Sequence, residues 1–241
     1  MADKPLVAVT GASSGIGEAV AKAFSAAGHP VLMMARRLER MQALNLPNSM
    51  ARKVDVRDRA EIAAAVKEAE EKYGPVDMMF ANAGIARLAD IGRQPPEEWD
   101  EMIDINTKGM LNTVHAVMSG MMARRRGTLF MMSSIAGRKV YPDHTVYCGT
   151  KFFVHAISES LRDYLSDYDV RVIVLSPGVI ETEVLSGVLD PTTLANYKAN
   201  KVKMGGGIGP EHVAGLMLHA YQMPQNALVQ EIVITPTRQK Y

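Results

Sequence analysis

The sequence has little cysteine, little net charge and no long apolar run, and each shortage excludes a class of protein. Its 241 residues include one cysteine, Cys148, so no internal disulfide can form and no cysteine cluster can hold zinc. The 27 lysines and arginines nearly balance the 26 aspartates and glutamates, and a net charge of +1 does not attract nucleic acid. No apolar run approaches membrane-spanning length. We therefore expect a cytoplasmic protein with no structural metal, no nucleic acid and no membrane among its partners.

Short apolar runs alternate with longer segments whose apolar residues recur every three or four positions. This alternation predicts repeated strand–helix units on a parallel sheet, with helices on both faces. The expected strands are Leu6–Thr10, Val31–Ala35, Met50–Asp55, Asp77–Ala81, Gly127–Ser133, Val170–Ser176 and Leu228–Ile234. The expected helices lie near 15–27, 58–73, 96–124, 146–168 and 210–222. Residues 1–241 should therefore form one Rossmann-type, doubly wound α/β domain with seven parallel strands in the order 3-2-1-4-5-6-7.

One stretch, about 178–209, shows no regular pattern and contains three consecutive glycines, Gly205 to Gly207. It follows the sixth expected strand, and open α/β sheets bind ligands at the carboxyl ends of their strands. Long irregular loops in compact domains are commonly lids or disordered. We predict a substrate lid at this position.

The first expected strand runs directly into a glycine-rich turn at residues 10–17, which leads into a helix. Glycines let the backbone approach a pyrophosphate, whose charge is stabilised by the helix N-terminus. The spacing GxxxGxG differs from the GxGxxG of longer dehydrogenases, and no Gly-Lys-Ser/Thr follows, which excludes a P-loop. Alone, such a turn also fits ordinary turn chemistry. The cofactor-binding residues predicted here are Gly11, Ser13, Ser14, Gly15, Ile16 and Gly17.

The end of the second expected strand bears on the choice of dinucleotide. An NAD site would place a carboxylate there for the ribose hydroxyls, whereas this chain has Arg36 and Arg37. Two guanidinium groups can hold a 2′-phosphate through paired hydrogen bonds. We predict NADP(H) over NAD(H); the alternative is that the two arginines merely begin a solvated helix.

Tyr147 and Lys151 lie four residues apart in an expected helix, so their side chains share one face. Tyrosine has an ordinary pKa near 10 and exchanges protons near neutral pH only if its anion is stabilised. An ammonium group about 4 Å away, at an effective dielectric constant of about 20, contributes about 4 kcal/mol before desolvation. The spacing alone is common and usually structural. Two nearby features add to it: the fifth expected strand ends at Ser133 and Ser134, and Asn106 lies in the helix before it.

Together these residues resemble the short-chain dehydrogenase/reductase family, in its single-domain branch. The resemblance covers essentially the whole chain. The one departure is Ala81, where the family motif usually begins with asparagine. The matching positions are Thr10, Gly11, Gly15, Ile16, Gly17, Asp55, Val56, Asn82, Ala83, Gly84, Asn106, Ser134, Tyr147, Lys151, Pro177, Gly178 and Thr182.

The resemblance implies a role for each matching residue. Tyr147 would be the general acid in carbonyl reduction and the base in the reverse direction, while Lys151 would lower its pKa and bind the nicotinamide ribose. Ser134, with Ser133 as the alternative, would hydrogen-bond the substrate oxygen, and Asn106 would hold a water linking Lys151 to bulk solvent. The implied cofactor contacts are Asp55 and Val56 at the adenine, Asn82, Ala83 and Gly84 at the adenosine, and Pro177, Gly178, Val179, Ile180 and Thr182 at the nicotinamide.

Within the family, the A-R-R-L-E-R run at 35–40, the segment 55–59 and the ending 234–237 resemble NADP-dependent 3-hydroxy acid dehydrogenases of the serine type. The implied function is hydride transfer from NADPH to a small ketone, aldehyde or 3-oxo acid, or the reverse oxidation of an alcohol or 3-hydroxy acid. The alternative is a non-catalytic NADP(H)-binding sensor or scaffold, because a fold does not establish a function. The complete set of Asn106, Ser134, Tyr147 and Lys151 favours the enzyme.

The identity of the substrate stays open at this stage. Tyr141 and His144 are expected to line its pocket, and Met204, Val184 and Leu185 of the lid are candidates to close over it. Family members typically pair through the helices corresponding to 96–124 and 146–168, so the resemblance implies a homodimer or homotetramer. The candidates for holding a substrate carboxylate are Arg87, Arg93, Arg138 and Lys139.

Overall fold

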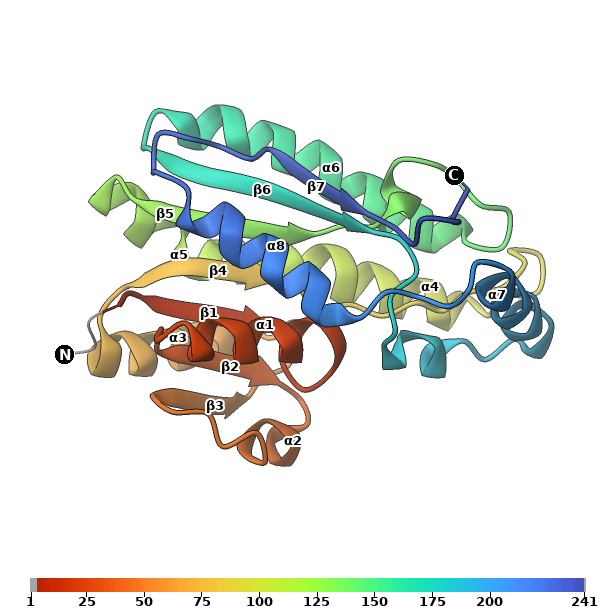
Figure 1. The fold of residues 1–241 in the computed structure, drawn as a ribbon, viewed down its shortest axis with the longest axis horizontal. Coiled ribbons are helices and arrows are strands. Elements are labelled where there is room, and N and C mark those ends of the chain that lie inside the picture. Colours follow the sequence, from red (N-terminus) through yellow and green to blue (C-terminus); the bar gives the residue numbers. More distant parts are fainter. Residues whose placement is uncertain (1–3, 241) are drawn as a thin grey trace.

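The computed structural model describes residues 4–240, which form one sheet of seven parallel strands. The strand order is β3-β2-β1-β4-β5-β6-β7, which confirms the predicted Rossmann-type topology (Figure 1). Because the winding direction reverses between β1 and β4, the loops that follow these two strands diverge and leave room for a ligand. The strands are β1 Leu6–Thr10, β2 Val31–Ala35, β3 Ser49–Lys53, β4 Val76–Ala81, β5 Gly127–Met132, β6 Val170–Pro177 and β7 Glu231–Ile234.

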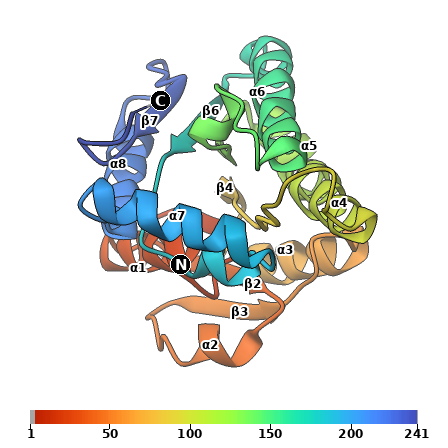
Figure 2. The same ribbon diagram turned by 90° about the vertical axis from the view of Figure 1, so that its right-hand side faces the viewer.

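Helices cover both faces of the sheet, as the consecutive apolar residues of the strands predicted. Helices α1 (Gly15–Ala26) and α8 (Pro210–Gln222) lie side by side on one face (Figures 1 and 2). Helices α3 (Arg59–Tyr73), α5 (Gly109–Arg124) and α6 (Thr145–Ser166) cover the other. Every residue of β1, β2, β4, β5 and β6 is buried, so the core lies on both sides of these strands. Within residues 4–240, no helix is long and apolar enough to cross a membrane.

The remaining helices are short and lie between the main ones or at the open end of the sheet. Helix α2 (Leu38–Gln42) follows β2 and was not predicted. The expected helix at 96–124 consists of α4 (Pro96–Ile103), a π-helical turn at Asp104–Lys108, and α5. Two 3₁₀ turns, Ile135–Gly137 and Glu183–Gly187, follow β5 and β6.

The prediction that residues 178–209 lack regular structure is wrong. This stretch contains the 3₁₀ turn at Glu183–Gly187 and helix α7 (Pro191–Lys203), which lies across the carboxyl ends of the strands (Figure 2). Asp190 caps the N-terminus of α7, and its carboxylate accepts the backbone N–H of Thr193 at 2.7 Å. Only Thr193 is fully buried in this helix, while Leu194 and Tyr197 are partly buried against an apolar cluster. So short an apolar face gives sequence periodicity little to detect.

Candidate active site

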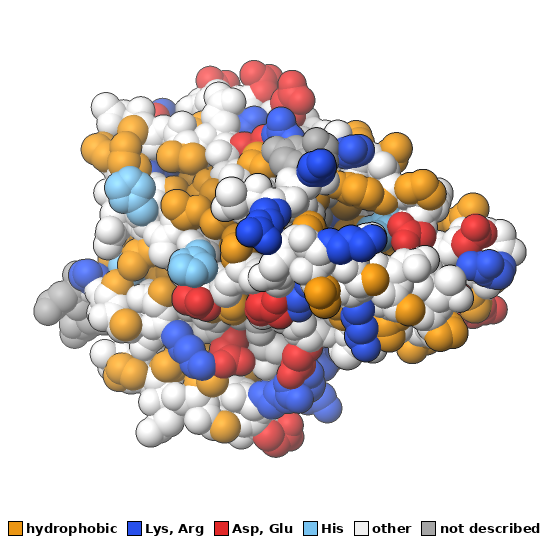
Figure 3. All heavy atoms as spheres, turned by 45° about the vertical axis from the view of Figure 1, so that its right-hand side comes forward, with side chains coloured by type: hydrophobic (Ala, Val, Ile, Leu, Met, Phe, Trp, Pro, Cys, Tyr) orange, Lys and Arg blue, Asp and Glu red, His pale blue; other side chains and the backbone are white. Residues whose placement is uncertain are grey.

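A cavity of about 950 Å³ lies at the carboxyl ends of the strands. Its walls come from the turn after β1, the ends of β2 and β5, the loop after β4, the start of α6 and the segment after β6. All the predicted cofactor-binding and catalytic residues line it except Gly17 and Asn106. Lys/Arg and Asp/Glu side chains lie among one another on the side of the molecule where these strand ends come forward (Figure 3). The structure thus brings together residues as far apart in the sequence as Gly11 and Lys240.

The glycines of the β1–α1 turn are required by its geometry. Gly11 and Gly15 have φ angles of +66° and +56°, in the left-handed region that side chains rarely adopt. A Cβ atom on Gly17 would lie 2.4 Å from the Gly11 carbonyl oxygen. Gly17 therefore supports the turn from behind, which explains why it does not line the cavity.

Asn82 holds this turn against the loop that follows β4. Its side-chain amide donates to the Thr10 carbonyl oxygen at 2.9 Å. The Thr10 hydroxyl accepts the backbone N–H groups of Asn82 and Ala83 at 3.0 and 3.2 Å. The amide group of Asn82 thus fixes the glycine turn, in addition to lining the cavity as predicted.

Arg37 lies over the glycine turn and donates to three side chains. Its Nε and Nη2 donate to the hydroxyls of Ser13 and Ser14 at 3.2 and 2.7 Å. Its Nη1 donates to the Glu183 carboxylate at 2.9 Å. Arg40 of α2 donates to both oxygens of the same carboxylate, at 2.7 and 2.9 Å. Hydrogen bonds from Arg40 and Arg37 hold the pKa of Glu183 below its usual value. No local sequence pattern indicates Arg40 and Glu183, because their pairing depends on how the lid folds.

The loop after β3 closes the far end of the cavity. Asp55 lines this end, and its carboxylate accepts the Nε and backbone N–H of Arg57, both at 3.0 Å. These hydrogen bonds lower the pKa of Asp55. The carbonyl oxygen of Val56 accepts the side-chain amide of Asn112 at 2.9 Å, which fixes the loop to α5.

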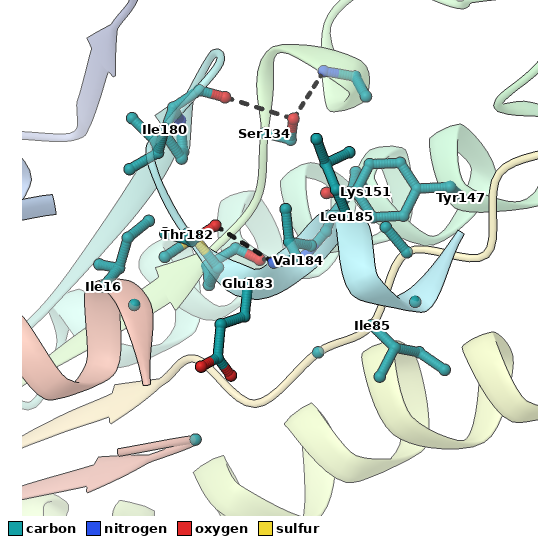
Figure 4. A pocket seen from close by; sticks show the side chains of 18 of the residues that line it. Ile16, Ile85, Ser134, Tyr147, Lys151, Ile180, Thr182, Glu183, Val184 and Leu185 are labelled. Atoms are coloured by element: carbon teal, nitrogen blue, oxygen red, sulfur yellow. Dashed lines mark hydrogen bonds between the residues drawn. The ribbon is translucent and has the colours of Figure 1, made fainter. Parts of the chain in front are cut away.

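Tyr147 and Lys151 share the first turns of α6 and face the cavity (Figure 4). The Lys151 ammonium lies 5.6 Å from the centre of the Tyr147 ring and donates to the Met132 carbonyl oxygen at 3.0 Å. Ser134 follows β5, where its hydroxyl accepts the backbone N–H of Ala136 at 3.1 Å and donates to the Pro177 carbonyl at 3.3 Å. Ser133 also lines the cavity, but its hydroxyl donates to the Lys151 carbonyl oxygen at 3.0 Å and the residue is only 2% exposed, so Ser134 is the better placed of the two to meet a substrate.

Burial is the largest influence on the pKa values of both Tyr147 and Lys151. Burial raises the pKa of Tyr147 above its ordinary value, and the Ser134 hydroxyl offsets only part of that rise. Burial also lowers the pKa of Lys151 to about 8. Desolvation disfavours the charged form of each group, and the role of Lys151 in lowering the pKa of Tyr147 stays a prediction. The raised pKa favours the protonated phenol of Tyr147, which is the form that donates a proton.

Asn106 lies in the π-helical turn and is 1% exposed. Its side chain accepts the backbone N–H of Ile85 at 2.8 Å and donates to the Ile85 carbonyl at 2.9 Å and to the Thr150 hydroxyl at 3.2 Å. A Cβ atom on Gly84 would lie 3.2 Å from its Oδ1 and 3.7 Å from the Lys151 Nζ. Asn106 thus fixes the loop after β4 beside Lys151, from a position behind the cavity wall. Single π-helical turns occur frequently at functional sites.

The segment after β6 forms the wall opposite Tyr147. The backbone N–H of Val179 donates to the side-chain oxygen of Gln239 at 2.9 Å, and that of Gly178 donates to the Ile234 carbonyl at 2.8 Å. The Thr182 methyl group lies against the glycine turn, where a Cβ on Gly15 would meet it at 2.9 Å. Gln239 lines the cavity from the C-terminal segment, which no sequence signal had indicated.

Aromatic and apolar side chains surround the Tyr147 end of the cavity. The ring of His144 lies 6.2 Å from that of Tyr147 and is stacked on Tyr197 at 6.4 Å. Its Nδ1 lies 2.6 Å from an Asp143 oxygen. Burial raises the pKa of Tyr197 to about 12. Ala86, Leu88, Val188, Leu185 and Leu194 form an apolar cluster with Tyr147 and Tyr197.

The cationic candidates for holding a substrate carboxylate are mostly engaged elsewhere. Arg87 lines the cavity, yet it donates to Glu101 at 3.0 Å and to the Gly187 carbonyl at 2.7 Å. Arg138 pairs with Glu231. Arg93 and Lys139 do not line the cavity. Within residues 4–240, no three His, Cys, Asp or Glu side chains gather so that they could hold a metal ion.

Comparisons with known proteins agree with this geometry. The short chain dehydrogenase family model matches residues 5–191. An uncharacterised oxidoreductase of Listeria monocytogenes is 33% identical over 244 residues, which cover 98% of both chains. A glycine betaine reductase of Emericella nidulans is 36% identical over 235 residues, but the matched region is only 18% of that longer protein.

Among solved structures, the closed form of a serine dehydrogenase complexed with NADP⁺ superposes with a TM-score of 0.90 at 31% identity, covering 98% of this chain and 96% of that one. Serine dehydrogenase from Escherichia coli gives a TM-score of 0.85 at 30% identity, covering 98% of this chain and all of that one. These matches extend over nearly the whole chain. The chain therefore belongs to the short-chain dehydrogenase family.

Proposed function

We propose that the chain is an NADP(H)-dependent oxidoreductase that reduces a small ketone, aldehyde or 3-oxo acid, and oxidises the corresponding alcohol or 3-hydroxy acid in reverse. The observation that carries this proposal is that Tyr147, Lys151 and Ser134 face the same cavity as the glycine turn and Arg37. A nucleotide-binding protein without catalysis would need only the glycine turn and Arg37. Tyr147, Lys151 and Ser134 have no evident structural task that requires a phenol beside a buried ammonium.

The residues present fit a 2′-phosphorylated dinucleotide. The β1–α1 turn offers close backbone approach and a helix N-terminus to a pyrophosphate. Arg36 and Arg37 line the cavity where β2 ends and would hold the 2′-phosphate, while Asp55 and Val56 would receive the adenine. Asn82 to Gly84 would contact the adenosine, and Pro177 to Thr182 the nicotinamide. A similar chain that is known in complex with NADP⁺ supports this placement.

The chain's own residues would manage the proton and the substrate. When bound, NADPH supplies the hydride for the carbonyl carbon. The Ser134 hydroxyl would donate a hydrogen bond to the carbonyl oxygen, and Tyr147 would donate the proton to it as negative charge develops. The raised pKa of Tyr147 keeps this proton in place until the substrate oxygen accepts it. The Lys151 ammonium would then stabilise the tyrosinate, and Asn106 would hold the loop that lies beside that ammonium.

Three further statements are predictions. Homodimers or homotetramers would form through α4, α5 and α6, where the large apolar side chains of Ile103, Leu111 and Phe152 are exposed. The protein would act in the cytoplasm. The segment 178–209 would act as the lid, since its Leu185 packs against the same apolar cluster as Tyr147.

The experiment is to measure initial rates of NADPH and NADH oxidation with small ketones, aldehydes and 3-oxo acids. Tyr147→Phe is the test variant, and Tyr164→Phe, an exposed tyrosine on the same helix, is the matched control. We expect faster turnover with NADPH, a loss of about 10²- to 10⁴-fold in Tyr147→Phe, and full activity in the control. Tight NADPH binding without turnover on any carbonyl would instead favour the sensor.

A further inference from the structure

The lid carries a carboxylate at the position proposed for the 2′-phosphate. Glu183 lies in the 3₁₀ turn after β6, and its side chain points away from Tyr147 (Figure 4). It pairs with Arg37, which is 146 positions earlier in the chain, and with Arg40. The acid is thus held by two guanidinium groups from the end of β2 and from α2, across the mouth of the cavity.

A carboxylate and a phosphate compete for the same donors. Both are oxyanions, and both accept paired hydrogen bonds from guanidinium groups. Arg37 already uses its Nε and Nη2 for Ser13 and Ser14, so its Nη1 is the group that Glu183 occupies. The side chains of Arg37, Arg40 and Glu183 are about half exposed, at 45%, 50% and 49%. Exposed pairs of this kind contribute little stability, so a phosphate with more charge and more acceptor oxygens can replace the carboxylate.

We propose that Glu183 is a latch that ties the lid to Arg37 and Arg40, and that the 2′-phosphate of NADP(H) releases it by taking its place. The proposal rests on the proposed function, since it needs the 2′-phosphate at these arginines. It adds Arg40 to the residues that hold the phosphate. NAD(H), which has no 2′-phosphate, leaves the latch closed.

The latch is directly connected to the residues that cover the substrate. Thr182 precedes Glu183 and lies against the glycine turn, while Leu185, two residues later, packs against the same apolar cluster as Tyr147 (Figure 4). No side chain in the Glu183–Gly187 turn is fully buried, although Leu185 packs against the apolar cluster and the Gly187 carbonyl accepts a hydrogen bond from Arg87. Release of Glu183 therefore loosens the part of the lid near the catalytic tyrosine, and the lid as well as the arginines responds to the choice of dinucleotide.

The experiment compares two nucleotides that differ only in the 2′-phosphate. Adenosine 2′,5′-bisphosphate and adenosine 5′-monophosphate are titrated by calorimetry into the full chain, into Glu183→Gln and into Glu181→Gln. Glu181 is the matched control, because it is a second lid glutamate that pairs with Lys201 and the Gly207 N–H, away from Arg37. We expect Glu183→Gln to bind the bisphosphate roughly three- to tenfold more tightly, and the monophosphate with unchanged affinity. Glu181→Gln should match the unaltered chain for both.

Hydrogen exchange gives a second readout that does not depend on catalysis. In the unaltered chain, the bisphosphate should speed amide exchange in residues 184–188, whereas the monophosphate should not. In Glu183→Gln, exchange there should already be fast without any nucleotide. Unchanged bisphosphate affinity in Glu183→Gln, or equal effects of both glutamate variants, would overturn the latch. If the unaltered chain bound the two nucleotides equally, the NADP(H) site itself would be refuted, and the latch with it.

Discussion

Replacing Lys151 by methionine should stabilise the fold while it abolishes catalysis. Lys151 is 4% exposed, and burial lowers its pKa from 10.5 to about 8. That difference corresponds to about 3 kcal/mol of destabilisation when the ammonium is charged. Methionine has a similar length and no charge, but it loses the hydrogen bond to the Met132 carbonyl, which offsets about 1–2 kcal/mol. A net gain of about 1–2 kcal/mol is expected at pH 7, or a rise in Tm of roughly 2–6 °C.

The stability difference between Lys151→Met and the unaltered chain should change with pH in one direction. Below pH 8, Lys151 is protonated in both the folded and the unfolded chain, and the full cost of burying the charge is present. Between pH 8 and about 10.5, only the unfolded chain keeps the proton, so this contribution to the free energy of unfolding rises with pH. The advantage of Lys151→Met should therefore shrink as pH rises from 7 to 9.5. Because the variant and the unaltered chain share all other titrating groups, the difference between them isolates this one.

Urea unfolding at pH 7, 8.5 and 9.5, at one fixed protein concentration, measures the difference. Lys67→Met is the control, since that lysine is 79% exposed and weakly paired with Glu71 at 4.0 Å. Its difference from the unaltered chain should be small and should not vary with pH. If Lys151→Met were less stable at pH 7, with a difference that stayed constant up to pH 9.5, burial would not be the dominant influence on Lys151. The account of the Tyr147 pKa would then fail as well, because it rests on the same desolvation.

Three other predictions concern the turn, the dinucleotide and the lid. Gly17→Ala should lose about 1–3 kcal/mol of stability in urea because its Cβ meets the Gly11 carbonyl at 2.4 Å, whereas Gly149→Ala, which meets nothing within 4 Å, should not. Equal stability of these two variants would contradict the geometry of the turn. Arg37→Gln should weaken NADPH binding about tenfold or more and leave NADH binding nearly unchanged in calorimetry; an equal loss for both would remove Arg37 from the 2′-phosphate site. Leu185→Asp should raise the KM for the carbonyl, because the new carboxylate would lie in the apolar cluster around Tyr147; unchanged steady-state constants would argue against a lid.

Local patterns predicted the sheet and most of the residues around the cavity. The glycines of the β1–α1 turn were predictable because left-handed φ angles and a close backbone approach tolerate little else. The parallel sheet followed from alternating strands and helices, since parallel strands need crossover connections, and its strand order followed from the resemblance to the short-chain dehydrogenase/reductase family. The same topology also predicted that Ser134 and Tyr147 lie at the carboxyl edge of the sheet. These features depend on residues near one another in the sequence, or on rules that hold for every sheet of this kind.

What the sequence did not predict depends on contacts between distant segments and on solvent exclusion. The pairing of Arg40 with Glu183 exists only because α2 and the lid meet over the cavity, and neither segment has an apolar stripe that marks its position. The direction of the Tyr147 pKa likewise depends on how many atoms surround the phenol, which its spacing from Lys151 does not contain. The Arg40–Glu183 pairing and the raised pKa of Tyr147 are connected through the lid. A lid whose Leu185 packs against the same apolar cluster as Tyr147 also helps to keep water from that cluster, so releasing Glu183 should lower the pKa of Tyr147 toward its ordinary value. Bound NADP(H) would do the same in the unaltered chain, so Glu183→Gln should lower the pKa of Tyr147 in the chain without cofactor, as measured by the ultraviolet absorbance of the phenolate, and should make no difference once NADP(H) is bound.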